Sequence, residues 1–123
     1  MEESTPETLD DILKKLLASI PEVKSAAVVS VEGLPIASVL PQGVDETRIA
    51  AMTAAILSLG ERAAMEMNKG DLEQIYVRGS NGYLLVLEAG KNAVLTVSTT
   101  RDVRLGLIFL DCKRTCQKIA ELI

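Results

Sequence analysis

Apolar residues recur at helical spacing in the first stretch of the chain, TPETLDDILKKLLASI, where a single stripe begins at Leu9. Thr5 is the expected N-cap of this helix, with Pro6 at the first helical position. A similar pattern closes the chain, with Asp102 as the expected N-cap and a stripe that continues to Ile123. Each of these helices has one apolar side, which suits packing on a single face of a sheet.

Short runs of β-type residues, separated by turn residues, occupy much of the remaining chain. The predicted strands cover residues 25–31, 34–40, 72–79, 83–89 and 93–99. Pro35 cannot donate a hydrogen bond to a ladder, so the second strand is expected at a sheet edge. The pair Asn81 and Gly82 is a strong hairpin signal between the third and fourth strands. The last two strands are apolar on both faces, as expected of central strands covered on both sides.

The predicted order of elements is α-β-β-α-β-β-β-α, with no internal repeat and no linker. We therefore expect one domain over residues 1–123, an α/β (α+β) layer sandwich built on a five-stranded antiparallel sheet. The first and last helices are expected on one face of this sheet. Only the middle helix remains to cover the other face of the central strands.

The middle helix, RIAAMTAAILSLGERAAMEM with Asp45 as its expected cap, is apolar on two sides. A bulky stripe is predicted to pack on the sheet: Ile49, Met52, Ile56, Leu59, Ala63 and Met67. A second stripe of mostly small residues has no expected partner within the chain: Ala50, Ala54, Leu57, Glu61 and Ala64. We expect this second stripe to pack on the same helix of a second copy, antiparallel across a two-fold axis. The strand that follows would then lie beside its counterpart, which adds to the predicted dimer interface Ile75, Tyr76 and Val77.

A third side of the middle helix is weakly apolar and lightly charged. It comprises Thr47, Ala51, Ala55, Ser58, Arg62 and Met65. In a dimer this arc would face outward, and its composition suits a transient protein partner better than a substrate pocket. Two simpler interpretations stay open. The small stripe is exposed because alanine is the best helix former, or the third arc is an ordinary solvated helix side.

Composition limits the classes of partner. The only aromatic residues are Tyr76, Tyr83 and Phe109, and the formal net charge is −4 without a cluster of lysines and arginines. Nucleic acid is not an expected partner, because phosphate binding needs a basic patch and base stacking needs aromatic side chains. The acidic N-terminus is unlike a signal peptide, and no apolar run approaches the roughly 20 residues that cross a bilayer. A cytoplasmic protein without direct membrane insertion is expected.

The sequence carries no catalytic motif. It has no histidine for acid–base chemistry near neutral pH, no glycine-rich phosphate loop and no nucleophile elbow. Cys112 and Cys116 lie on the core side of the last helix and are expected to be buried small hydrophobes, with a functional thiol pair as the alternative. Two thiols without histidine make a poor zinc site. We expect no enzyme activity, no cofactor and no metal.

Several segments resemble the Roadblock/LC7 domain in the same order, namely VEGLPIAS, AAMTAAILSLGERAAMEMNKGDLEQIYVRG and RLGLI, and the similarity covers nearly the whole chain. The resemblance implies a small non-catalytic module that dimerises through its middle helix and third strand. Such domains work as dynein light chains, as scaffold subunits on lysosome-like membranes, or as partners of Ras-like GTPases. The branch similar to MglB acts on its GTPase as an activating protein. This chain is expected to be the bare domain without long tails.

Together these features predict a homodimeric regulator or scaffold that binds a small Ras-like GTPase. An arginine supplied in trans can stabilise charge during GTP hydrolysis, and the candidates are Arg48, Arg62 and Arg78, although each is more simply a surface charge. A regulator can equally act by holding the switch region of the GTPase in a productive position. The alternatives are a motor light chain that binds an intermediate-chain peptide, and a small-ligand sensor supported only by analogy between folds.

Overall fold

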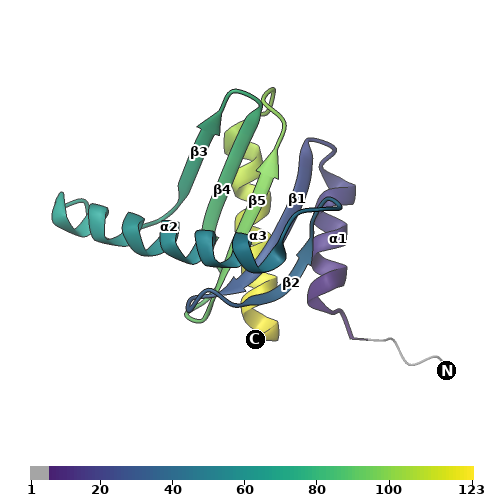
Figure 1. Ribbon diagram of the computed structural model, residues 1–123, viewed down its shortest axis with the longest axis horizontal. Helices are drawn as coiled ribbons and strands as arrows, with labels where there is room; N and C mark the ends of the chain where they lie inside the picture. The colour runs from purple at the N-terminus through teal and green to yellow at the C-terminus, as the bar shows by residue number, and fades with distance from the viewer. Residues whose placement is uncertain (1–5) are drawn as a thin grey trace.

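The computed structural model describes residues 6–123. The elements are α1 (Leu9–Ser19), β1 (Val23–Ser30), β2 (Pro35–Val39), α2 (Glu46–Glu66), β3 (Ile75–Gly79), β4 (Gly82–Glu88), β5 (Ala93–Thr99) and α3 (Leu105–Leu122). The strands form one antiparallel five-stranded sheet in the order β2-β1-β5-β4-β3. Helices α1 and α3 cover one face and α2 crosses the other (Figure 1). The predicted fold class is confirmed, as is the edge position of the strand that contains Pro35.

Helix α2 runs across the whole of its face of the sheet. At its start, the hydroxyl of Ser38 in β2 donates a hydrogen bond to Glu46. Further along, α2 passes closely over β3, since a Cβ added at Gly60 would lie 2.5 Å from Cδ1 of Ile75. The C-terminal part of α2 then extends past β3 into solvent (Figure 1). One side of the molecule is therefore made by the edge strand β3 and the helix above it.

The side of α2 that packs on the sheet is only partly the bulky stripe that the sequence predicts, since Ile49 and Ile56 pack against the core beneath α2 but the rest of the stripe is exposed. Ala50, Thr53 and Leu57 are buried, whereas Leu59 and Met67 are 64% and 69% exposed. The cause lies in the facing strands, where Ala27 of β1 and Thr96 of β5 are register partners in the layer beneath α2. Such small side chains let a helix approach closely, which leaves room for Ala50 and Thr53 but not for a bulky row.

This packing also corrects two residues of the predicted dimer interface. Ala50 and Leu57 are fully buried or nearly so in the core of their own chain, together with Val86 and Val94. They are therefore covered within the chain, and neither is available to a second copy. The remaining residues of that stripe are half-buried or exposed, namely Ala54, Glu61 and Ala64.

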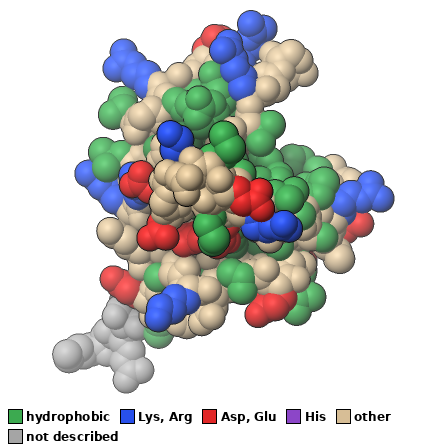
Figure 2. All heavy atoms as spheres, turned by 90° about the vertical axis from the view of Figure 1, so that its left-hand side faces the viewer, with side chains coloured by type: hydrophobic (Ala, Val, Ile, Leu, Met, Phe, Trp, Pro, Cys, Tyr) green, Lys and Arg blue, Asp and Glu red, His purple; other side chains and the backbone are tan. Residues whose placement is uncertain are grey.

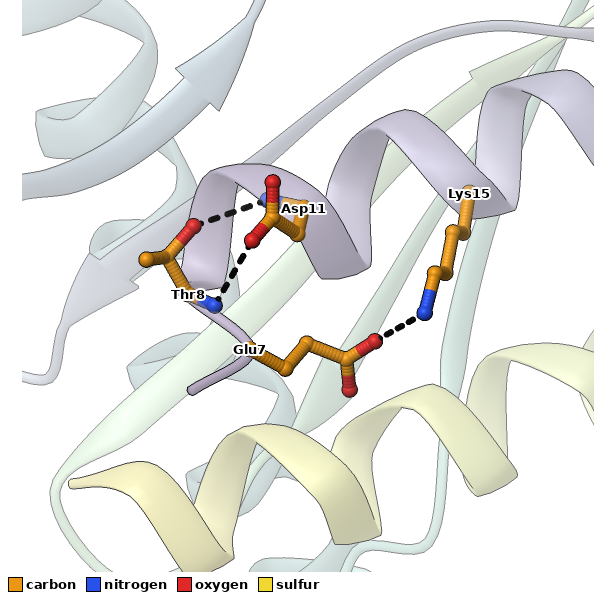
Figure 3. Close-up of polar contacts among 4 residues, drawn as sticks. All are labelled: Glu7, Thr8, Asp11 and Lys15. Carbon is orange, nitrogen blue, oxygen red and sulfur yellow. Dashed lines mark hydrogen bonds and ion pairs between the residues drawn. The ribbon is translucent and has the colours of Figure 1, made fainter. Parts of the chain in front are cut away.

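Helix α1 begins three residues later than predicted, because a capping box fixes its start. The hydroxyl of Thr8 accepts a hydrogen bond of 3.2 Å from the N–H of Asp11, and the carboxylate of Asp11 accepts one of 3.0 Å from the N–H of Thr8 (Figure 3). The bond from the backbone N–H of Thr8, followed by the effect of the Thr8 hydroxyl on the carboxylate, lowers the pKa of Asp11. Glu7 forms an ion pair with Lys15, which lies one turn after Asp11. Thr8, not Thr5, is the N-cap, and Thr5 itself lies outside the described residues.

Of the N-caps predicted for the other two helices, one is confirmed and one is wrong. Asp45 caps α2 as predicted, accepting from the N–H groups of Thr47 at 3.0 Å and Arg48 at 3.4 Å. At α3 the N-cap is Arg104, which makes no side-chain capping bond, so the prediction of Asp102 is wrong. The first turn of α3 closes instead on backbone, because the carbonyl of Arg104 accepts from the following turn at 3.1 Å.

Thr96 carries a buried hydroxyl that has no hydrogen-bond partner among the described residues. Thr96→Val keeps the shape of the side chain and removes the desolvated hydroxyl, so we expect the free energy of unfolding to rise by about 1 kcal/mol. Urea denaturation measures this change. Thr99→Val is the matched control, because the hydroxyl of Thr99 donates a 2.8 Å bond to the carbonyl of Thr100 and its loss should not stabilise the protein. A Thr96→Val protein no more stable than the Thr99→Val protein would contradict this account.

Candidate functional site

Helix α2 is the longest helix within the described residues, and its outward side carries exposed apolar residues. Every residue of the predicted partner-facing arc is exposed: Thr47, Ala51, Ala55, Ser58, Arg62 and Met65. The arc bears little charge, since Arg62 pairs with Glu66 at 3.9 Å on the helix surface. Such exposed pairs contribute at most about 1 kcal/mol and leave the guanidinium free to rearrange. The arc is therefore open to a partner along most of its length.

Bulky apolar residues lie beside this arc. Met52 and Leu59 on α2 and Met67 at its C-cap are exposed, as is Met65 within the arc itself. The neighbouring edge strand adds Tyr76 and Val77, both about half exposed. Figure 2 looks onto this end of the molecule and shows exposed hydrophobic side chains beside a group of acidic ones. Sequence reasoning missed Met52 and Leu59 as surface residues because bulk alone suggested that they face the sheet.

Strand β3 presents different side chains to its two faces. Ile75 and Val77 point to the α2 side, where Ile75 packs against the core beneath α2. Tyr76 points to the opposite face, with its ring centroid 6.2 Å from that of Phe109 in α3 and 6.1 Å from that of Tyr83. Within the described residues β3 pairs only with β4, so its outer edge offers unpaired backbone groups. The predicted interface residues on β3 therefore lie at a free edge of the sheet.

The candidate arginines are not brought together. Arg48 and Arg62 lie on exposed positions of α2, about four turns apart. Arg78 lies on the other face of the sheet, with its guanidinium carbon 6.0 Å from the ring centroid of Tyr83. Arg78 therefore does not share a surface with Arg48 and Arg62.

A hollow of about 600 Å³ lies under the C-terminal end of α2, and its acidic lining escaped the sequence prediction. Glu61, Asp71 and Glu88 line it together with Met65 and Leu72. Burial, together with the carboxylates of Glu61 and Asp71, raises the pKa of Glu88. These carboxylates come from three separate segments of the chain, so no local motif could have revealed them.

The cysteine thiols are buried within the main core, as predicted for small hydrophobes. Desolvation raises the pKa of Cys112 and Cys116 from 9.0 to about 12, and neighbouring Asp111 adds to the effect at Cys112. Both groups are therefore thiols, not thiolates, near neutral pH, and only thiolates react readily with electrophiles. The arrangement suits packing rather than redox or metal chemistry.

We expect iodoacetamide at pH 8 to label Cys112 and Cys116 at least about a hundredfold more slowly in the folded protein than in urea. The raised pKa values also predict a pH dependence of stability. Unfolding frees the thiols to ionise above about pH 9, so the free energy of unfolding should fall as the pH rises from 9 towards 12. Rapid labelling of the folded protein would contradict the buried placement.

None of the described helices is long and apolar enough to span a membrane.

Comparison with known proteins gives consistent results. The family model described as Roadblock/LC7 domain matches residues 9–99. Protein MJ1340 of Methanocaldococcus jannaschii is 41% identical over 100 residues, which cover 81% of this chain and 87% of that protein. The crystal structure of a Roadblock/LC7 domain from Streptomyces avermitilis aligns with a TM-score of 0.86 at 22% identity, over 94% of this chain and 98% of that chain.

Two structures of MglB have the same fold. The protein from Myxococcus xanthus aligns with a TM-score of 0.84 at 21% identity, over 93% of each chain. An MglB with a tetrameric arrangement aligns with a TM-score of 0.82 at 20% identity, over 92% of this chain and 85% of that chain. Since the family model extends from the start of α1 to the end of β5, the chain belongs to the Roadblock/LC7 family.

Proposed function

We propose that this protein is a non-catalytic, homodimeric regulator or scaffold that acts in the cytoplasm and binds a small Ras-like GTPase. The observation that carries the proposal is the uncovered outward side of α2, where Met52 and Leu59 are exposed in the single chain, beside the exposed arc that contains Met65. Large apolar side chains gathered on one exposed face are typical of protein–protein interaction sites.

The proposed dimer interface joins the outer side of α2 to the free edge of β3. From the sequence prediction it keeps Ile75, Tyr76 and Val77. On α2 it takes the exposed residues Met52 and Leu59, which are seven positions apart on one flank of the helix. Ala50 and Leu57 are buried, and Ala54, Glu61 and Ala64 lie on the opposite flank of α2, so these five residues are left out. A second copy related by a two-fold axis would cover both the apolar helix surface and the unpaired strand edge. The tetrameric arrangement of one MglB supports self-association of this fold.

The proposed GTPase surface is the exposed arc of α2 that contains Ala55 and Arg62. In a dimer built on α2, the arcs of both copies would lie side by side and form one wider surface. The shared fold with MglB supports this assignment, since the MglB-like branch is the one that the sequence resemblance links to a GTPase. Arg48 or Arg62 would then contact the GTPase, either near its phosphates or at its switch region.

Ala55→Glu and Arg62→Glu are each expected to weaken GTPase binding by at least tenfold, which corresponds to about 1.4 kcal/mol. The reason is that a carboxylate at either position would be desolvated against the partner without a cation to pair with. Isothermal titration calorimetry with the GTPase loaded with a GTP analogue measures the affinity. Lys91→Glu, in the turn between β4 and β5, makes the same charge change as Arg62→Glu and should bind normally. Unchanged binding by both α2 variants, or loss of the dimer in them, would count against this surface.

A further inference from the structure

A groove separates α1 from α3 on the face of the sheet opposite to α2. It has a volume of about 320 Å³, and buried Ile12 and Leu16 form its floor. Its rims carry Lys15 from α1 and Arg114 and Lys118 from α3. The groove therefore combines an apolar floor with cationic edges on both sides.

The charge of this groove is opposite to that of the molecule. Asp111 is the only acidic residue among those that line it, against the cations of Lys15, Arg114 and Lys118, in a chain whose net charge is −4. Arg114 pairs with Asp111 at 3.8 Å, and Lys15 pairs with Glu7, but the cationic side chains of both pairs are exposed. Exposed ion pairs contribute at most about 1 kcal/mol, so an incoming carboxylate can replace them. Lys118 makes no ion pair within the described part of the chain.

The same side of α3 continues towards its N-terminus with exposed apolar residues. Leu107 is 55% exposed and lies seven residues before Arg114, on the same side of the helix. A second hollow of about 570 Å³, which Leu107 lines, shares Ile20 and Asp111 with the groove. Its charges are mixed, with Arg101 and Arg104 beside Glu22 and Asp102, so it extends the apolar surface but not the cationic edge. From Leu107 to Lys118 the continuous surface extends about 16 Å, roughly three helical turns.

We propose that this groove docks an acidic amphipathic helix of a second partner protein. The apolar side of that helix would pack on Ile12, Leu16 and Leu107, and its carboxylates would pair with Lys15, Arg114 and Lys118. The lining combines apolar and charged side chains, which favours a peptide over a membrane, because polybasic membrane-binding sites gather roughly four to eight lysines and arginines on one surface. The groove and α2 lie on opposite faces of the sheet (Figure 1), so one protomer can hold this helix and a GTPase at the same time.

The test uses a synthetic peptide of about 15 residues that forms a helix with leucines at i, i+3, i+4 and i+7 and glutamates flanking them. Fluorescence anisotropy of the labelled peptide should show saturable binding to the full chain with a Kd on the order of 10–100 μM, as befits a small interface. In ¹⁵N–¹H correlation spectra the peptide should shift the amides of Lys15, Ser19, Arg114 and Lys118 and leave α2 unperturbed.

The variant Arg114→Glu/Lys118→Glu should bind this peptide at least tenfold more weakly. Lys24→Glu/Lys91→Glu carries the same change in net charge away from the groove and should bind like the native chain. A peptide of identical composition, scrambled to remove its helical periodicity, should lose binding. Circular dichroism confirms that both variants are folded.

Three results would overturn the proposal. The first is an absence of saturation up to about 1 mM peptide, because a Kd above this concentration is too weak for a specific site. The second is a set of shifts confined to α2, and the third is equal binding by the charge-reversed and control variants. Sedimentation of the native chain with phosphatidylserine vesicles, lost in Arg114→Glu/Lys118→Glu, would assign the groove to a membrane surface instead. Because no GTPase is present in these assays, their failure would leave the proposed function of α2 unaffected.

Discussion

Replacing Gly82 with alanine is expected to lower the free energy of unfolding by about 3–5 kcal/mol, a large share of the stability of a small domain. Gly82 begins β4 with φ at +151°, in a region that side chains rarely adopt. A Cβ at this position would lie 1.9 Å from the carbonyl oxygen of Thr99 in β5. That oxygen belongs to the last residue of the central strand β5, where Tyr83 and Thr99 are register partners, so it cannot move without shifting this end of the β4–β5 pair.

Gly70→Ala is the matched control for this prediction. Gly70 also has a positive φ, +82°, but nothing lies within 4 Å of the Cβ that alanine would add. Its substitution should therefore cost only the strain of a left-handed residue, about 1 kcal/mol. Urea denaturation of the two variants separates the clash from the strain. Equal destabilisation by the two variants would contradict the close approach of Gly82 to the carbonyl of Thr99.

Leu59→Glu is expected to convert the proposed dimer into a folded monomer. In the single chain Leu59 is 64% exposed, so its replacement should change the stability of the protomer by no more than about 0.5 kcal/mol. In the proposed dimer the glutamate would be desolvated against the partner, and an unpaired buried charge costs about 3–5 kcal/mol. The dissociation constant of the dimer should therefore rise by at least about a hundredfold.

Size-exclusion chromatography with light scattering, or sedimentation equilibrium, measures this shift in mass. Ser58→Glu introduces the same charge at the preceding position, about 100° round the helix and on the arc assigned to the GTPase, and it should remain dimeric. A Leu59→Glu protein that is still fully dimeric would remove Leu59 from the interface. A native chain that is monomeric at all concentrations would remove the α2 interface altogether.

The elements and their layering were predictable because the signals for them are local. Helical spacing, alternating strands and turn residues such as Gly33 and Gly82 each act over a few positions. The cap of α1 had a local signal too, since Thr8 and Asp11 have the spacing of a capping box. The prediction chose Thr5 and Pro6 because both residue types also favour helix starts, and only the reciprocal hydrogen bonds decide between the two.

The orientation of α2 could not be read from its own sequence. A helical wheel ranks sides by bulk, whereas the side that faces the sheet is set by small residues of distant strands. Ala27 and Thr96 come together only through the register of β1 with β5. Their small side chains select the small side of α2, so Leu59 is left in solvent. This error moved part of the predicted interface without changing the fold.

The surfaces show the same division between local and long-range information. The arc of α2 that the sequence assigns to a partner is exposed, and its mild composition is visible within a single helix; its role stays a prediction. The acidic hollow near Glu88 and the cationic groove near Lys118 were not predicted. Each is assembled from segments that lie far apart in the sequence, and no pattern within any one segment distinguishes its residues from ordinary surface charges.

The most direct test of the proposed function is a pull-down with the native chain from a lysate of its source organism, run once with a GTP analogue and once with GDP. The account predicts that a Ras-like GTPase is retained with the GTP analogue, and that Ala55→Glu, used as bait, fails to retain it. Retention of a motor subunit or of another Roadblock/LC7 chain regardless of nucleotide, without a GTPase, would contradict the regulatory function and leave a structural adaptor.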